Sequence, residues 1–193
     1  VRGQGLTYSD YARRGFFELL AVSIMVLIVI VGLDFLTRRE DDRAHSIFLS
    51  GTGIMIGLAV VMLVSAYMRM QLYEEAYGFT HLRLYPHVFM VWLAILLAAV
   101  LVMLATRQMR YFLSVGLIAA VGYLITLNVI NPDLYIARQN IARTRRGEEL
   151  DVRFLNSLSD DSLIELLPLL DNPQYRDEIG PCLSVRLARL DRW

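Results

Sequence analysis

Four long apolar runs constrain what this chain can fold into more than any other feature of its sequence. A helix that crosses a lipid bilayer needs about 20 mostly apolar residues. Four runs are of this kind and carry no charge in their central turns: 16–36, 47–68, 88–105 and 111–130. They lack the alternating pattern of barrel strands, and lipid admits only helices or closed barrels. The sequence therefore predicts an all-α, polytopic membrane helical bundle of four transmembrane helices, followed by a short helical tail.

The composition agrees with a membrane protein and disfavours a soluble enzyme. Apolar residues make up 56% of the 193 residues and charged residues 20%, against roughly 45–50% and about 25% in soluble domains. The mean hydropathy is +0.47. The formal net charge is zero, so no overall positive field favours nucleic acid as a partner. The single cysteine, Cys182, cannot form an internal disulfide.

The arginines predict how the chain is oriented in the membrane. Nine arginines lie before the first run, between the second and third runs, or just after the fourth, and five lie in the other two connections. Because cytoplasmic loops carry the excess of basic residues, both ends of the chain are expected in the cytoplasm. The chain then divides into a cytoplasmic or interfacial N-terminal segment (1–15), a transmembrane domain (16–130) and a cytoplasmic tail (131–193). Its first residue is Val1 rather than Met, which predicts a longer gene product.

Local signals predict several helix ends. The second helix is expected to run past the membrane to Gly78, because glycine is a common helix stop. Thr80 can cap the helix that enters the third run. Asn131-Pro132 is expected to end the fourth helix, because a proline disfavours helical conformation in the residue before it. Asp133 can then cap the helix that follows.

The tail differs in character from the rest of the chain. Its pattern indicates about four short amphipathic helices, and either Asp151 or Ser159 can start one of them. Its leucines recur at helical spacing and form an apolar stripe: Leu158, Leu163, Leu166, Leu167 and Leu170. The stripe is too small to predict an independent core. The helices can therefore pack on one another, on the membrane surface or on a partner.

The strongest polar cluster is expected at the cytoplasmic ends of the first three runs. Its members are Tyr11, Arg13, Arg14, Glu18, Arg69, Glu74, Glu75, His81 and Arg83. Arg14 and Glu18 are four residues apart, so they can pair on one helix face. The favoured interpretation is an Arg–Glu network that anchors helix ends, because ion pairs near the interface cost little. The alternative is a site for a phosphate headgroup or another anion, which arginine suits.

Within the predicted spans the informative residues are small or carry an amide. Gly53 and Gly57 form a small-xxx-small pair in the second span, and Gly116 and Gly122 are candidate packing positions in the fourth. Such residues allow helices to approach closely. Asn128 is the one amide in a span and is the candidate intramembrane polar residue. Because no charge lies at the centre of a span, helix packing is favoured over a pore lining.

The segment after the fourth span carries the candidate tail contacts. In a helix, Tyr135 and Arg138 share one face, and Asn140 and Arg143 share the next. Their arginines could meet anionic lipid headgroups or a protein partner. The simpler interpretation is an interfacial helix that leads the chain off the membrane.

The sequence offers little for metal binding or catalysis. His45 is expected on the opposite side of the membrane from His81 and His87, which are six residues apart and do not share one helix face. No HExxH or CxxC spacing is present, and there is no P-loop, dinucleotide or nucleophile motif. Cys182 has no neighbouring histidine. The sequence therefore predicts no cofactor, no metal and no enzymatic activity.

Four stretches resemble a family of uncharacterised bacterial membrane proteins. They are residues 7–19 (TYSDYARRGFFEL), 69–85 with its EAYGFT centre, 131–143 (NPDLYIARQNIAR) and 155–161 (LNSLSDD). The family is domain of unknown function 4173, which is related to the 4153 group. The resemblance covers nearly the whole chain. It implies a multi-pass protein of the bacterial cytoplasmic (inner) membrane, and it brings no activity with it.

The sequence leaves three hypotheses of function. The first is a non-catalytic accessory or scaffold subunit, whose cytoplasmic face and tail contact a protein partner, a second copy or anionic lipid. The second is a component of a transporter or channel, which is less favoured because no buried ionisable residue is expected in the spans. The third is a lipid-modifying membrane enzyme that would use Glu74, Glu75 and His81.

Overall fold

The computed structural model describes residues 8–36, 42–144 and 147–190, and their side chains in 17–36, 42–144 and 147–188. The elements in these ranges are helices, and no strand occurs among the described residues. The prediction of an all-α fold is therefore confirmed.

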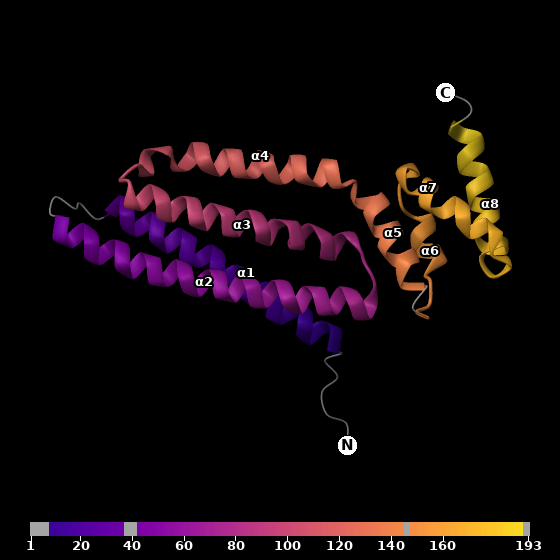
Figure 1. Cartoon of the computed structure of the whole chain (residues 1–193), viewed down its shortest axis with the longest axis horizontal. Coiled ribbons are helices and arrows are strands. Elements are labelled where there is room, and N and C mark those ends of the chain that lie inside the picture. Colours follow the sequence, from indigo (N-terminus) through magenta and orange to yellow (C-terminus); the bar gives the residue numbers. More distant parts are fainter. Residues whose placement is uncertain (1–7, 37–41, 145–146, 191–193) are drawn as a thin grey trace, which may run out of the picture. The chain divides into compact units, whose positions relative to one another are not determined.

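Within the described ranges, four helices are long and apolar enough to cross a membrane. They are α1 (Tyr8–Leu36), α2 (Asp42–Tyr77), α3 (His81–Ala105) and α4 (Phe112–Ile130), and a short 3-10 helix, η1 (Met109–Tyr111), precedes α4. Figure 1 shows α2, α3 and α4 running alongside one another, with successive helices reversing direction. The four spans predicted from the apolar runs are confirmed as helices.

Helix α2 extends well beyond a membrane-crossing length, as predicted. It has 36 residues, which at 1.5 Å per residue is roughly 54 Å, against about 30 Å for the hydrocarbon core. It ends at Tyr77, and Gly78 follows with a φ of +85°. This left-handed conformation favours glycine, so Gly78 is the helix stop. The carbonyl of Thr80 then accepts the amides of Arg83 and Leu84, so α3 begins immediately after the turn.

The junction between α4 and the tail differs from the prediction in its capping residue. Helix α4 ends at Ile130, and Asn131 adopts a φ of +49°. Asn131, and not Asp133, caps the next helix, α5 (Pro132–Thr144): its side chain accepts the amide of Leu134 at 3.4 Å and its carbonyl accepts that of Tyr135. The reason is that proline suits the first position of a helix, which makes the residue before it the cap.

The chain separates into two compact units. We call Val1–Ala76 with Tyr85–Thr126 the membrane unit, and Tyr77–Leu84 with Leu127–Trp193 the tail unit. The sequence placed the start of the tail at residue 131 and kept the turn between α2 and α3 apart from it. In the structure that turn belongs to the tail unit.

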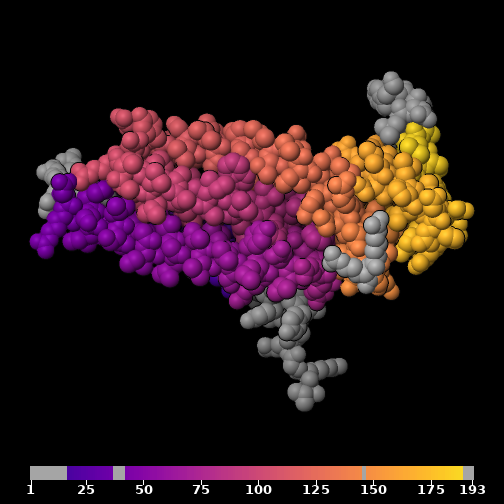
Figure 2. Space-filling model, in the orientation of Figure 1, coloured from indigo at the N-terminus to yellow at the C-terminus, as the bar shows by residue number. Residues whose placement is uncertain are grey.

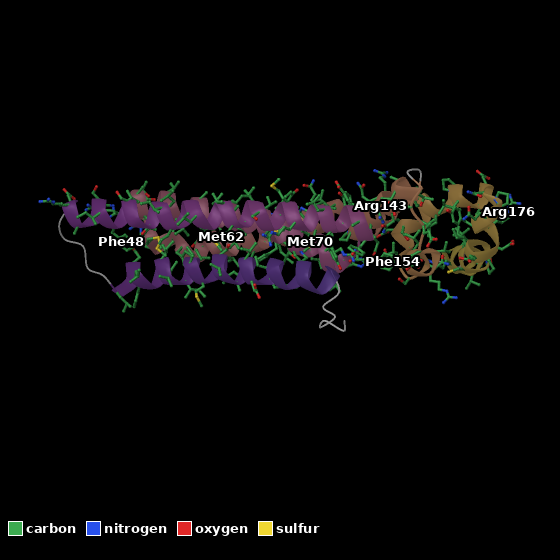
Figure 3. The ribbon with its side chains drawn as sticks, turned by 90° about the horizontal axis from the view of Figure 1, so that it is seen from below. Phe48, Met62, Met70, Arg143, Phe154 and Arg176 are labelled. Atoms are coloured by element: carbon green, nitrogen blue, oxygen red, sulfur yellow. The ribbon has the colours of Figure 1, made fainter. Side chains whose placement is uncertain are left out.

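The core of the membrane unit follows one face of α2. Its buried positions recur every three or four residues: Thr52, Ile56, Ala59, Leu63, Ala66, Met70 and Glu74. Leucines and methionines of α3 complete this core: Met90, Leu93, Leu97, Met103 and Leu104. In the view of Figure 2 the surface of α3 lies between the surfaces of α2 and α4. Figure 3 labels Met70, one of the buried residues of α2.

Helix α4 approaches α3 closely at one glycine, Gly122. A Cβ on Gly122 would lie 2.7 Å from Cζ2 and Cζ3 of Trp92 and would also meet its Cη2. The Trp92 indole N–H donates to Thr126 Oγ1 at 3.1 Å. The other three predicted packing positions differ. A Cβ on Gly53 would make an ordinary 3.9 Å contact, and one on Gly57 or Gly116 would meet nothing within 4 Å.

The tail unit has a core of its own, which the sequence did not predict. Beyond α5 it contains α6 (Val152–Asn156), η2 (Asp160–Ser162), α7 (Leu163–Leu166), η3 (Leu167–Asp171) and α8 (Pro173–Leu190). Its buried apolar residues are Ile136, Ala137, Val152, Leu155, Leu158, Leu163, Leu166, Ile179 and Leu183. These side chains come from α5, α6, α7, α8 and the links between them, so the helices cover one another's apolar faces.

Two details of the tail follow from local chemistry. Asp151 caps α6 by accepting the amide of Phe154 at 2.9 Å, as the sequence indicated. Leu167 departs from the predicted stripe and is exposed. The reason is that the α-helix tightens into a 3-10 helix at Leu167-Pro168, which changes the angular spacing of the side chains.

Candidate functional site

The centre of the candidate site is a pair of hydrogen bonds between Asn140 of α5 and the turn that joins α2 to α3. The amide of Phe79 donates to Asn140 Oδ1 at 2.9 Å, and Asn140 Nδ2 donates to the carbonyl of Phe79 at 2.9 Å. One side chain thus satisfies both backbone groups of a residue 61 positions away. We call these two bonds the Asn140 latch. It brings together the EAYGFT and NPDLYIARQNIAR motifs.

Two arginines surround the same turn at the C-terminal end of α2. Arg83 donates to the carbonyl of Gly78 through Nη1. A Cβ on Gly78 would lie 2.8 Å from Arg143 Nη1 and 2.9 Å from Asn140 Oδ1. Cations are stabilised at a helix C-terminus by its partial negative charge. The chemistry at this point is therefore the capping of α2, which accounts for both arginines without a bound ligand.

Further contacts join α5 to the turn. The rings of Phe79 and Tyr135 meet edge to face, with centroids 6.1 Å apart. His81 Nε2, in the first turn of α3, lies 2.7 Å from Asp133 Oδ1, in the first turn of α5. A carboxylate beside the N-terminal ends of two helices is favoured by both helix dipoles.

The candidate tail contacts turn out to have partners inside the tail unit. Tyr135 and Asn140 contact Phe79, as described above. Arg138 Nη2 lies 2.8 Å from Glu165 Oε1, and Arg143 Nη2 lies 3.6 Å from Glu148 Oε2. A third pair joins Arg186 Nε to Asp160 Oδ1 at 2.8 Å. The four predicted residues thus hold the tail unit together, which the sequence had offered as contacts to lipid or a partner.

A cavity of about 190 Å³ adjoins the latch within the tail unit. Its lining includes Tyr77, Thr80, Arg143, Glu149 and Phe154, and Figure 3 labels Arg143 and Phe154 on this part of the chain. The single cation of this lining is already near Glu148, and Asp151, another lining residue, already caps α6. The cavity therefore offers an anionic ligand no cation that lacks an acidic neighbour, and its other charged lining residue is Glu149.

The structure buries an ionisable pair in the membrane unit. Glu74 of α2 is 3% exposed and His87 of α3 is 9% exposed. His87 Nδ1 lies 3.1 Å from Glu74 Oε2, and the ring of Tyr67 meets that of His87 edge to face at 4.0 Å between centroids. The sequence placed Glu74 in a network at the interface. It occupies the last buried position on the core face of α2 and pairs with His87 rather than with an arginine.

Periodicity was the signal that could have identified this pair. Glu74 follows Met70 by four residues, and His87 precedes Met90 by three. Both therefore continue the apolar faces of their helices. In the sequence, His87 was considered only as a metal ligand, although its spacing to Met90 predicts a position on the core face of α3.

The other members of the predicted polar cluster are not brought together with this pair. Glu18, Arg69 and Glu75 are exposed, and His81 and Arg83 belong to the turn. The side chains of Tyr11, Arg13 and Arg14 lie outside the described residues. The expected cluster is thus divided among a turn, a buried pair and solvent-facing positions.

Two remaining candidates have simple placements. Asn128 is exposed on α4, so it contributes little to packing within this chain. Among the side chains that the structure describes, no three histidine, cysteine or acidic groups are close enough to hold a metal ion. The predicted absence of a cofactor stays a prediction.

Replacing Asn140 is expected to weaken the tail unit. In Asn140→Ala both backbone groups of Phe79 lose their partner, which costs about 2 kcal/mol. Asn140→Asp is the matched control, because it keeps the acceptor for the Phe79 amide and loses only the donor. Hydrogen exchange at the Phe79 amide should accelerate strongly in the alanine variant and much less in the aspartate variant. Equal protection in all three proteins would mean that the latch does not form.

Gly78→Ala is expected to disturb the latch in addition to straining the backbone. Gly147→Ala is the control, because Gly147 also has a positive φ, of +92°, but a Cβ there would meet nothing within 4 Å. Backbone strain alone costs about 1 kcal/mol, so Gly78→Ala should lower the thermal midpoint more than Gly147→Ala. The only cysteine, Cys182, is half-buried in α8, and its labelling by a thiol-reactive dye on heating reports the midpoint.

Comparison with known proteins gives a family and no activity. A family model described as a domain of unknown function (DUF4153) matches residues 1–169. The resemblance to family 4173 is therefore corrected to the related 4153 family. No curated relative and no solved structure matches the chain. The matched region contains the four spanning helices, the latch and the buried pair. Because the match covers residues 1–169 of 193, the chain belongs to the DUF4153 family.

Proposed function

We propose that this chain is a non-catalytic membrane scaffold whose tail unit binds a protein partner. The observation that supports it most is the construction of the tail unit. That unit has its own apolar core, and within it Asn140 of α5 is hydrogen-bonded to the turn that joins α2 to α3. A pre-ordered unit binds a partner with a smaller loss of conformational entropy than a disordered tail does.

The binding surface that fits this role lies on α7 and η3. Ile164 is 70% exposed and Leu167 is 41% exposed, although Leu163 and Leu166 between and beside them are buried. Residues three apart in a helical segment lie on the same side. The tail unit therefore offers an aliphatic surface next to its core, which we call the Ile164 face.

The proposal is tested by purifying the full chain in mild detergent at native expression level and identifying co-eluting proteins by mass spectrometry. Ile164→Asp/Leu167→Asp alters the Ile164 face. Val185→Asp is the matched control, because Val185 is an exposed aliphatic residue on α8. Circular dichroism on heating should show that both variants keep the folded tail unit.

A stoichiometric companion that is lost in the double variant and retained in Val185→Asp is the expected result. A protein that elutes alone at native expression level contradicts the scaffold function. A companion that persists in the double variant contradicts the assignment of the Ile164 face.

A second candidate function, a component of a transporter or channel, is favoured by the buried Glu74–His87 pair. Ionisable residues that are buried in membrane proteins often line pathways for ions or protons. The sequence disfavoured this function because it expected no such residue in the spans, and Glu74 and His87 are buried just beyond the predicted spans 47–68 and 88–105. Ion flux into liposomes that is lost in Glu74→Gln and kept in Glu75→Gln would favour transport over the scaffold.

The residues named for a lipid-modifying enzyme do not share a common partner. Glu74 contacts His87, His81 contacts Asp133, and Glu75 is exposed. No observation of this structure favours that third hypothesis over the other two.

A further inference from the structure

The Glu74–His87 pair is costly to bury and is not accounted for by the fold. Glu74 Oε1 and His87 Nε2 are both buried and, among the described residues, have no hydrogen-bond partner. Each unsatisfied buried polar atom costs about 1–3 kcal/mol. A leucine at each position would continue the apolar faces of α2 and α3 without this cost.

A buried polar pair often fixes the register of two helices, but the short connection between α2 and α3 already does so here. Such pairs can fix the register of two packed helices. Helices α2 and α3 are joined by only three residues, 78–80, and this short connection already limits how far one helix can slide along the other. The pair lies at the same end as the connection, where the register is most constrained.

The geometry of the pair resembles a carboxylate–imidazole dyad. Glu74 Oε2 is 3.1 Å from His87 Nδ1, a distance at which the carboxylate accepts the Nδ1–H. A carboxylate that holds one ring nitrogen of a histidine fixes the tautomer and leaves the other nitrogen to accept a proton or bind a ligand. The other nitrogen, Nε2, is the one without a partner.

We propose that Glu74 and His87 form an acid–base site in which His87 exchanges a proton through Nε2 while Glu74 holds Nδ1–H. The proton comes from a water molecule or a hydroxyl-bearing molecule that is hydrogen-bonded to Nε2, and the donor keeps the electron pair. The imidazolium that results is stabilised by the Glu74 carboxylate. Glu74 is thus a positioning residue. This inference is independent of the scaffold function.

The other titratable and charged side chains of α1 to α4 that the structure describes near the pair do not take the place of His87 as the group that exchanges the proton. Tyr67 of α2 contacts His87 through its ring. Glu18 of α1 and Arg69 and Glu75 of α2 are exposed, and Tyr123 of α4 packs on Phe89. Arg83 of α3 donates to the Gly78 carbonyl. The remaining charged groups of α1 near its start are Asp10, Arg13 and Arg14, whose side chains lie outside the described residues.

The test is ¹⁵N NMR of the full chain in lipid nanodiscs with only its histidines labelled. The chain has three histidines, so His45→Gln and His81→Asn assign the signals by elimination. We expect His87 to carry a proton on Nδ1 throughout a pH titration, while Nε2 gains its proton as the pH is lowered.

The neutral form of His87 decides the test. A neutral histidine in water carries its proton mainly on Nε2, whereas the proposal places it on Nδ1. A neutral His87 that carries its proton on Nε2 would overturn the proposal. An Nε2 signal that does not change during the titration would overturn it as well. Arg69→Gln serves as a control, because Arg69 is exposed, and it should leave the His87 tautomer unchanged.

Glu74→Gln provides a second readout that a purely structural role would not move. The glutamine amide can donate to Nδ1 as well as accept from it, so this variant should show both neutral tautomers of His87. The exposed neighbour variant, Glu75→Gln, should keep the wild-type tautomer. Identical spectra for Glu74→Gln and wild type would show that Glu74 does not set the tautomer, which contradicts its assigned role.

Discussion

Removing one member of the Glu74–His87 pair should be more damaging than removing both. In Glu74→Leu the imidazole of His87 stays buried without its partner, and breaking a buried pair in this way typically costs about 3–5 kcal/mol. In Glu74→Leu/His87→Leu no polar group is left unpaired, and both side chains continue the apolar core. Stability close to wild type is therefore expected for the double variant.

Unfolding in mixed micelles of mild and denaturing detergent measures this difference. The fluorescence of Trp92, in a Trp193→Phe background, reports the packing of α3 because these are the only two tryptophans. Glu75→Leu is the control, since Glu75 is exposed and should change stability little. A Glu74→Leu protein as stable as Glu75→Leu would show that Glu74 is not buried against His87.

The second large effect is expected at Gly122. The indole of Trp92 fills the space that a side chain at Gly122 would take, and its N–H is hydrogen-bonded to Thr126. Gly122→Val should therefore displace the ring and break the hydrogen bond from Trp92 to Thr126. Overpacking of this kind costs about 1–3 kcal/mol. The fluorescence maximum of Trp92 should shift as the indole changes its surroundings.

Gly116→Val is the matched control for this effect. Both glycines lie in α4, and a Cβ on Gly116 would meet nothing within 4 Å. Both variants replace a glycine of the same helix by valine, so they share one change in helix propensity, and their difference isolates the clash with Trp92. Equal stability of the two variants would mean that α4 does not approach α3 at Gly122.

The scaffold function and the acid–base site concern different parts of the chain. The first depends on the Ile164 face of the tail unit, and the second on two helices of the membrane unit. Loss of partner binding in Ile164→Asp/Leu167→Asp should leave the His87 signals unchanged. The two proposals can therefore fail independently.

The membrane helices and most of their ends were predictable from the sequence. Apolar runs of membrane-crossing length, the glycine after Tyr77 and the proline after Asn131 act through neighbouring residues. Such local signals do not depend on where the rest of the chain lies. The one incorrect cap, Asp133, was also a local matter, because a proline at the first helical position moves the cap to Asn131.

The partners of the polar residues were decided only by the tertiary structure. The sequence contains Glu74 and His87, and Asn140 and Phe79, but these pairs are 13 and 61 residues apart. Whether two such residues meet depends on which face each helix turns toward its neighbour. An interfacial cluster and a buried pair contain the same types of residue, so the residue types alone do not distinguish them. That choice was made by the long-range packing of α2 on α3, through close side-chain contact, and by the hydrogen bonds of α5 to the turn between them.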